Sequence, residues 1–211
     1  MQQFFVFVFT FLMVCCNAQT DTVAYSRDYE FKEGVFLTLE NFKKNTPISK
    51  SAIVSVLPKD QIDFLTQVLE QKTITYKDAA GVEQKLETKT IWGFCQNRTI
   101  LINFNGDFNR INVIGNLSLF SAVVVQTPLR NDPVGDMYGI QPNYTELRQF
   151  VLDTKNNKVF DFNAKNIEEL LKDDVELHAQ FVKLKKRKKA DSIFIYLRKY
   201  NEKHPLYLVL K

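Results

Sequence analysis

The stretch IWGFCQNRTILINFNGDFNRINVIGNLSLFSAVVV, residues 91–125, is the longest block of strand-forming residues in the chain. Short polar breaks divide it at Asn97-Arg98, Asn105-Gly106 and Gly115-Asn116. Asn-Gly between alternating strands is the strongest of these turn signals, because both residues tolerate positive φ. The stretch therefore predicts a β-meander with strands near 91–96, 99–104, 108–114 and 118–126.

The segments upstream of the meander carry shorter patterns. Thr38 is placed to cap a short helix, and Ala52–Val56 predicts a strand. Apolar residues at helical spacing predict a helix over 59–71. The alternating segments 73–77 and 83–88 flank a Gly-containing turn, so they predict a hairpin.

Downstream of the meander, Thr127–Asn143 has no repeating apolar pattern and holds three of the six prolines. We predict that it is the main loop, and loops of this length are uncommon and often functional. The segments 146–153 and 158–163 flank a polar turn and predict a second hairpin.

Residues 163–204 carry apolar residues at helical spacing and predict two helices. The basic run Lys183–Lys189 is expected to close the first helix, where cations suit the helix dipole. Asp191 and Ser192 are expected to cap the second helix. The apolar run Ile193–Leu197 leaves a strand as the alternative at this place.

Together the elements predict an α+β fold, an antiparallel β-meander with an N-terminal helix and a C-terminal helical pair. Hydrophobic residues make up 45% of the chain and charged residues 25%, a balance typical of a core-forming protein. Residues 19–211 are expected to form one domain, with the polar segment 19–32 as a flexible lead-in.

The N-terminal segment Met1–Ala18 has the pattern of a secretory leader. Its apolar run Phe4–Cys16 is too short to span a bilayer as a helix but has the length of a signal-peptide core. Small residues stand where a signal peptidase inspects the chain, so we predict cleavage after Ala18 and export to the periplasm, the cell envelope or the medium. Lipidation at Cys15 or Cys16 is the alternative, although neither follows the Gly, Ala or Ser usual at that place.

Composition argues against several kinds of chemistry. The net charge of +4 is mild, so nucleic acid is not expected as a partner. Without the leader, Cys95 is the single cysteine, and its place in an apolar strand predicts a buried, inert thiol. The two histidines, His178 and His204, fall short of the ligand set of a zinc site, so no metal or other cofactor is predicted.

Three segments resemble blocks in a family of exported, uncharacterised proteins of Bacteroidetes-type bacteria. They are EGVFLTLENFKKNTP (33–47), IWGFCQNRTILINFNGDFNRINVIG (91–115) and YLRKYNEKHPLYL (196–208). The resemblance covers most of the chain that follows the leader. It implies compartment and source, and it brings no catalytic residue to carry over, because no activity is established for that family.

Three functions are compatible with these observations. The first is a non-enzymatic envelope or secreted binding module whose partner is an envelope protein, a glycan or an anionic lipid. The second is a hydrolase with its carboxylates in the loop 127–143. The third is a peripheral membrane protein that docks through the basic run 183–189. The residues expected to form the binding surface are Asp132, Asp136, Tyr138, Lys185, Lys186 and Arg187.

Overall fold

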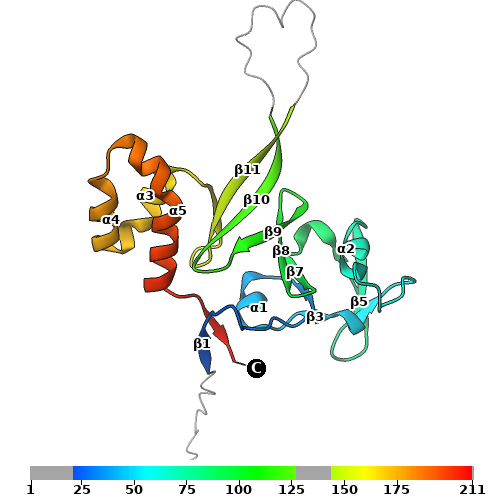
Figure 1. Cartoon of the computed structure of the whole chain (residues 1–211). Helices are drawn as coiled ribbons and strands as arrows, with labels where there is room; N and C mark the ends of the chain where they lie inside the picture. The colour runs from blue at the N-terminus through cyan, green and yellow to red at the C-terminus, as the bar shows by residue number, and fades with distance from the viewer. Residues whose placement is uncertain (1–20, 127–143, 211) are drawn as a thin grey trace, which may run out of the picture.

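The computed structural model describes residues 21–126 and 144–210 of the chain. Its main feature is a curled, eight-stranded antiparallel sheet with the meander in its middle (Figure 1). In spatial order the strands are β12 (Lys158–Asp161), β11 (Tyr144–Asp153), β10 (Leu117–Gln126), β9 (Asp107–Val113), β8 (Thr99–Phe104), β7 (Gly93–Gln96), β2 (Gly34–Phe36) and β3 (Ile48–Ser49). The predicted meander and the predicted hairpin after the loop are both confirmed.

Backbone torsions confirm two of the predicted turns. Asn97 and Arg98 have φ values of 50° and 61°, and Asn105 and Gly106 have values of 57° and 94°. Two-residue hairpin loops with positive φ at both positions match the twist of the strands they join. The short polar breaks therefore fix the register of β7, β8 and β9 locally.

Two smaller sheets flank the main one. One consists of β4 (Ile53–Val54), β5 (Thr73–Lys77) and β6 (Glu83–Glu87), and the other pairs β1 (Thr22–Ala24) with β13 (Tyr207–Val209). Within the lead-in predicted over 19–32, residues of the described part contact the rest of the fold. Tyr29 donates a hydrogen bond to the carbonyl of Val209 at 2.8 Å, and Phe31 stacks on Phe42 at a centroid distance of 4.8 Å. Although this segment is mostly polar, its aromatic rings pack on the core.

Five helices within residues 21–126 and 144–210 complete the α+β fold, which agrees with the predicted class. They are α1 (Leu39–Lys43), α2 (Phe64–Leu69), α3 (Ala164–Leu170), α4 (Val175–Val182) and α5 (Lys186–Lys203), with 3-10 turns at Lys50–Ala52, Thr88–Thr90 and Leu171–Asp173. Thr38 caps α1 as predicted, since its side-chain oxygen accepts a hydrogen bond from the amide of Asn41. None of the helices within the described ranges combines the length and the apolar character needed to cross a bilayer.

Several element bounds differ from the predictions, and residues 163–204 form three helices where two were predicted, because the 3-10 turn Leu171–Asp173 separates α3 from α4. The strand expected over 52–56 is reduced to Ile53–Val54. The helix expected from residue 59 begins at Phe64, because the preceding residues close two separate turns instead. The helix expected to start at Ser192 begins at Lys186, so the strand alternative at 193–197 is also excluded.

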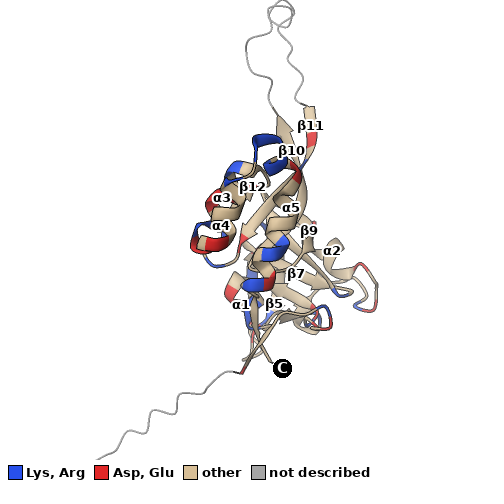
Figure 2. Cartoon of the chain, turned by 60° about the vertical axis from the view of Figure 1, so that its left-hand side comes forward, with Lys and Arg blue, Asp and Glu red and all other residues tan. Residues whose placement is uncertain are grey.

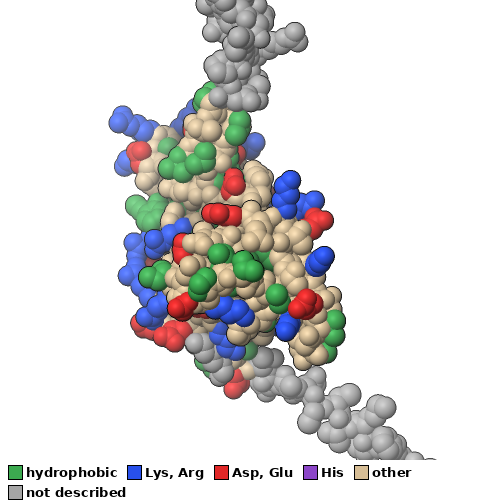
Figure 3. Space-filling view, turned by 90° about the vertical axis from the view of Figure 1, so that its right-hand side faces the viewer, with side chains coloured by type: hydrophobic (Ala, Val, Ile, Leu, Met, Phe, Trp, Pro, Cys, Tyr) green, Lys and Arg blue, Asp and Glu red, His purple; other side chains and the backbone are tan. Residues whose placement is uncertain are grey.

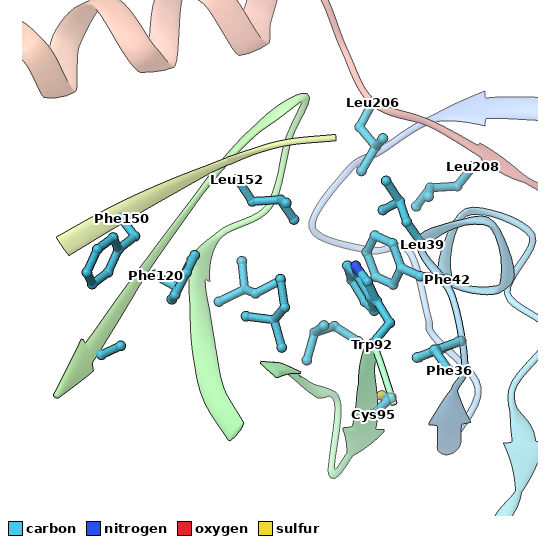
Figure 4. Close-up of a cluster of buried hydrophobic side chains, with 14 residues drawn as sticks. Phe36, Leu39, Phe42, Trp92, Cys95, Phe120, Phe150, Leu152, Leu206 and Leu208 are labelled. Carbon is cyan, nitrogen blue, oxygen red and sulfur yellow. The ribbon is translucent and has the colours of Figure 1, made fainter. Parts of the chain in front are cut away.

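In the described part of the chain the core consists of three clusters of buried apolar side chains that divide the sheet between them. In the first, Trp92 stacks on Phe42 at 4.7 Å, and Leu206 and Leu208 from the C-terminal segment close over them (Figure 4). The second lies between α3, α4, α5 and the start of β10 and β11, and the third lies under α2. The helical layer therefore covers only one end of the long β10–β11 hairpin (Figure 1).

Candidate functional site

The outer half of the β10–β11 hairpin extends beyond the rest of the sheet (Figure 1). The two strands pair over their full ten residues, but β9 pairs with β10 only at Leu119 and Phe120. On the opposite edge of the hairpin, β12 pairs with β11, and the last hydrogen bond between these two segments runs from the Phe162 amide to the Gln149 carbonyl. We call Ser121–Gln126 together with Tyr144–Gln149 the ribbon.

The ribbon has two unlike faces because side chains alternate along each strand. One face continues the first core cluster, with Ala122 buried and Val124 packed against it. The other face follows Leu119 and Val151, which pack on the helices further down. We call this second surface the helix-side face, and its members are Ser121, Val123, Val125, Thr145, Leu147 and Gln149.

Three aliphatic side chains on the helix-side face are uncovered. Val123 is 58% exposed, Val125 66% and Leu147 70%. Val123 and Leu147 are directly paired across the two strands, and Val125 lies two residues further along β10. Large apolar residues scattered singly on a surface are ordinary, but a contiguous group marks an interaction surface.

An open hollow of about 440 Å³ lies where the ribbon meets the start of α3. Ser121, Leu147 and Gln149 line it from the helix-side face, and Phe162 and Asn163 line it from the chain that leads into α3. The further residues along its wall are Glu146, Arg148 and Asp161, and Arg148 and Asp161 form an ion pair at 3.1 Å. The hollow gives the exposed face a recessed, polar base.

A group of cations stands at the connection between α4 and α5. It consists of Lys183, Lys185, Lys186, Arg187 and Lys188, which we call the basic corner. All five side chains are exposed, and none forms an ion pair within the part of the chain that the structure describes. The next cation, Lys189, differs because it pairs with Glu168 and lies over the ring of Phe181.

The basic corner contradicts the expectation that the run 183–189 closes a helix. Lys183 is the C-cap of α4, but α5 starts at Lys186 with Lys185 at its N-cap and no capping side chain. The first turn of α5 contains no acidic residue. Cations and the positive end of the helix dipole therefore add at one place, which concentrates positive potential.

Both views of the molecule place the basic corner and the ribbon at the same end (Figures 1 and 2). In Figure 2 the Lys and Arg residues of the α4–α5 connection stand at about the height of β10 and β11, and Figure 1 shows this connection to one side of the two strands. The face shown in Figure 3 is different, because its hydrophobic side chains lie in small groups between charges of both signs. The ribbon end thus combines uncovered aliphatic residues with the cations of the basic corner, and Glu146 is an exposed acid on the other face of the ribbon.

A second polar cluster fastens α5 to the sheet. Tyr200 donates a hydrogen bond to Asp173 at 2.7 Å, and Lys155 donates to both. Burial raises the pKa of Tyr200 to about 12. Burial works against the charged forms of Lys155 and Asp173, but their mutual hydrogen bonds outweigh it, so the pKa of Lys155 rises and that of Asp173 falls. All three groups keep one protonation state near neutral pH, as expected for a structural anchor rather than a proton-transfer site.

Cys95 has the environment predicted for it. The residue is fully buried in the first core cluster. Burial, with a further contribution from the charge of Glu33, raises the pKa of its thiol to about 12. A thiol with this pKa carries very little thiolate at neutral pH, so Cys95 is a packing residue.

The predicted surface residues divide into two groups. Lys185, Lys186 and Arg187 all lie in the basic corner. Asp132, Asp136 and Tyr138, with the whole loop 127–143, lie outside the described residues. Sequence reasoning missed Val123, Val125 and Leu147, because an apolar run in a strand has the same pattern whether the sheet or a partner covers it.

No group of three or more His, Cys, Asp or Glu side chains that could hold a metal ion occurs within residues 21–126 and 144–210. Comparison with curated proteins and comparison with solved structures each gave no match. A family model described as "Family of unknown function (DUF6563)" matches residues 34–204, a range that includes the meander, the ribbon strands and all five helices. The chain therefore belongs to this family of unknown function.

Proposed function

We propose that the protein is an exported, non-enzymatic binding module that engages its partner through the helix-side face of the ribbon and the basic corner. The observation that carries the proposal is the placement of both features at one end of the molecule (Figure 2). The apolar part is uncovered, and the cationic part has no ion pair within the described residues.

The apolar part of this surface provides a favourable free energy of association. Complete burial of a Val or Leu side chain is worth about 1.5–3 kcal/mol relative to full exposure. Since more than half of Val123, Val125 and Leu147 is exposed, a partner that covers all three gains roughly 3–5 kcal/mol from them. A two-stranded ribbon is marginally stable alone in water, so a bound partner also stabilises the ribbon itself.

Export is the second part of the proposal. The segment Met1–Ala18 has the apolar core and the small residues of a cleaved leader, and the three segments given above resemble exported proteins of Bacteroidetes-type bacteria. The described chain begins at Asp21, next to β1 and β13, at the end of the molecule opposite the ribbon (Figure 1). The residues before Asp21 therefore join the fold away from the proposed surface.

Site-specific photocrosslinking in the native host tests this proposal. A benzophenone amino acid replaces Leu147 in one variant and Val82 in a control, because Val82 is 55% exposed but lies in the β5–β6 turn. We expect discrete adducts from position 147 in the envelope fraction, on a protein whose mass shows that it begins at Gln19. The same adducts from both positions, or neither a protein adduct nor a lipid adduct from position 147, contradict the binding surface.

A further inference from the structure

We infer that the partner of the ribbon and the basic corner is an anionic lipid surface. This inference rests on the proposed function, since it names the class of partner for the same surface. Three properties of the surface carry it: the sign and number of its charges, the chemistry of its side chains, and the relative placement of its two parts.

The charge of the basic corner is nearly uncompensated. The acids on the neighbouring helices are engaged or remote: Glu168, Glu169 and Glu176 pair with Lys189, Lys172 and Lys203, and Asp191 and Glu202 lie further along α5. Glu146 is exposed on the other face of the ribbon. Each cation close to an anionic membrane strengthens binding by about fivefold, an effect that salt screens within a Debye length. The cations of the corner together therefore provide the long-range attraction.

The side-chain chemistry favours lipid over protein as the partner. Four of the five cations are lysines, which act as compact point charges, whereas Arg is the residue suited to fixed bidentate contacts. The large exposed apolar residues of the helix-side face are the aliphatic Val123, Val125 and Leu147, whereas the exposed ring of Tyr144 belongs to the other face of the ribbon. Protein interfaces instead concentrate their binding energy in Trp, Tyr and Arg. A surface of Lys with Val and Leu fits a fluid layer of phosphates above hydrocarbon.

The placement of the two parts supplies the pair of signals that stable membrane attachment needs. Basic residues alone or a small apolar group alone bind a bilayer weakly and reversibly, and the two together bind far more strongly. The ribbon and the basic corner lie at the same end of the molecule in both views (Figures 1 and 2), so one flat surface can approach both. In this orientation β1 and β13 lie at the far end.

Vesicle sedimentation with the chain from residue 19 to 211 tests the inference. The probes are phosphatidylcholine vesicles with and without about one third phosphatidylglycerol. Binding is measured at about 0.05 M and about 0.5 M salt. We expect binding to the anionic vesicles only, and a large loss of binding at the higher salt concentration. No binding to anionic vesicles at low salt overturns the inference.

Two triple variants separate position from net charge. Lys185→Gln, Lys186→Gln and Arg187→Gln remove three charges from the corner. Lys72→Gln, Lys77→Gln and Lys85→Gln remove three exposed charges around the β5–β6 hairpin. We expect about a 100-fold loss of binding from the first set and less than about threefold from the second. Equal losses from both sets overturn the inference.

A ribbon variant tests the apolar half of the surface. Val123→Ser with Leu147→Ser is expected to weaken vesicle binding about tenfold or more, with an unchanged urea midpoint because both side chains are exposed. Undiminished binding of this variant overturns the role of the ribbon. If anionic vesicles do not bind but position 147 still gives a discrete protein adduct in cells, lipid is wrong as the partner and the binding module stands. Absence of both results refutes both proposals.

Discussion

At the base of the β10–β11 hairpin, the side chain of Asn201 on α5 pairs with the backbone of β10 beyond the point where the pairing with β9 ends. Its side-chain oxygen accepts the amide of Leu117 at 2.8 Å, and its side-chain nitrogen donates to the carbonyl of Leu117 at 2.8 Å. On that edge of β10 the pairing with β9 reaches only Leu119. The side-chain amide of Asn201 therefore pairs with Leu117 as the backbone of β9 pairs with Leu119, two residues further along β10.

The magnitude follows from what Asn201→Ala leaves behind. Leu117 is 2% exposed, so its amide and carbonyl lose their partners in a place with little access to water. A buried polar backbone group without a partner costs about 1–3 kcal/mol, so we expect Asn201→Ala to lower the free energy of unfolding by about 3 kcal/mol. Asn109→Ala is the control, because Asn109 bonds only to the nearby carbonyl of Asp107 on the surface, and its expected cost is below about 0.5 kcal/mol.

Gly115 makes the prediction stricter because it lies directly against the Asn201 amide. A Cβ at Gly115 would overlap that side chain, which its two hydrogen bonds hold in place. Gly115→Ala should therefore displace Asn201 and cost about as much as Asn201→Ala. In the double variant the clash is gone, so the two effects should overlap almost completely instead of adding.

Urea unfolding followed by the fluorescence of Trp92, the single tryptophan, measures all four proteins of this cycle. Trp92 stacks on Phe42 within the first core cluster, so its signal reports loss of the core. Additive effects of Gly115→Ala and Asn201→Ala would refute the reasoning. A cost of Asn201→Ala below about 1 kcal/mol would refute it as well, because the two backbone groups would then not depend on the side chain.

Two further predictions concern titratable groups. The pKa of the Asp174 carboxyl is held well below its usual range, first by the hydrogen bond from the Leu177 amide and then by Lys203 and His204. The ionised carboxylate therefore stabilises the fold above the unfolded pKa of about 4, and this stabilisation is lost as pH falls through the lower folded value. Asp174→Asn should therefore destabilise by about 1–2 kcal/mol at neutral pH and by less in urea titrations below about pH 3, whereas a pH-independent cost would contradict the assignment. Because the pKa of Cys95 is about 12, iodoacetamide at about pH 8 should alkylate the native thiol about a thousandfold more slowly than the urea-unfolded thiol. Equal alkylation rates would show that Cys95 is accessible and ionised in the native protein.

The sequence predicts the sheet well because the signals for it are local. Alternation and the Asn-Gly turn determine β8 and β9 within a few residues of each other, and positive φ at Asn105 confirms the turn. The Asn201 contact has no such signal, since 84 residues separate it from Leu117. Local patterns cannot indicate which distant side chain completes a strand.

The predicted start of α5 was wrong for a related reason. Asp191 and Ser192 have good capping chemistry, and the cations before them suit the end of a helix. In the fold, Tyr196, Leu197 and Tyr200 bury one stripe of α5 against the sheet, and this packing holds the helix while it continues back to Lys186. Tertiary packing therefore outweighs local capping preference, as it does for most helices.

The placement of charge on α5 links its stability to its proposed role. Cations in the first turn of a helix each cost roughly 0.3–1 kcal/mol, and Lys186, Arg187 and Lys188 all stand there without a neighbouring acid in that turn. The opposite end of α5 carries the compensating contacts: the Tyr200 anchor and the Asn201 pairing with β10. The helix is thus fixed from its C-terminal half, and its N-terminal turn is able to keep charges that oppose its own dipole. A partner that offsets this repulsion would stabilise the first turn of α5, and the anionic lipid layer proposed above would do so.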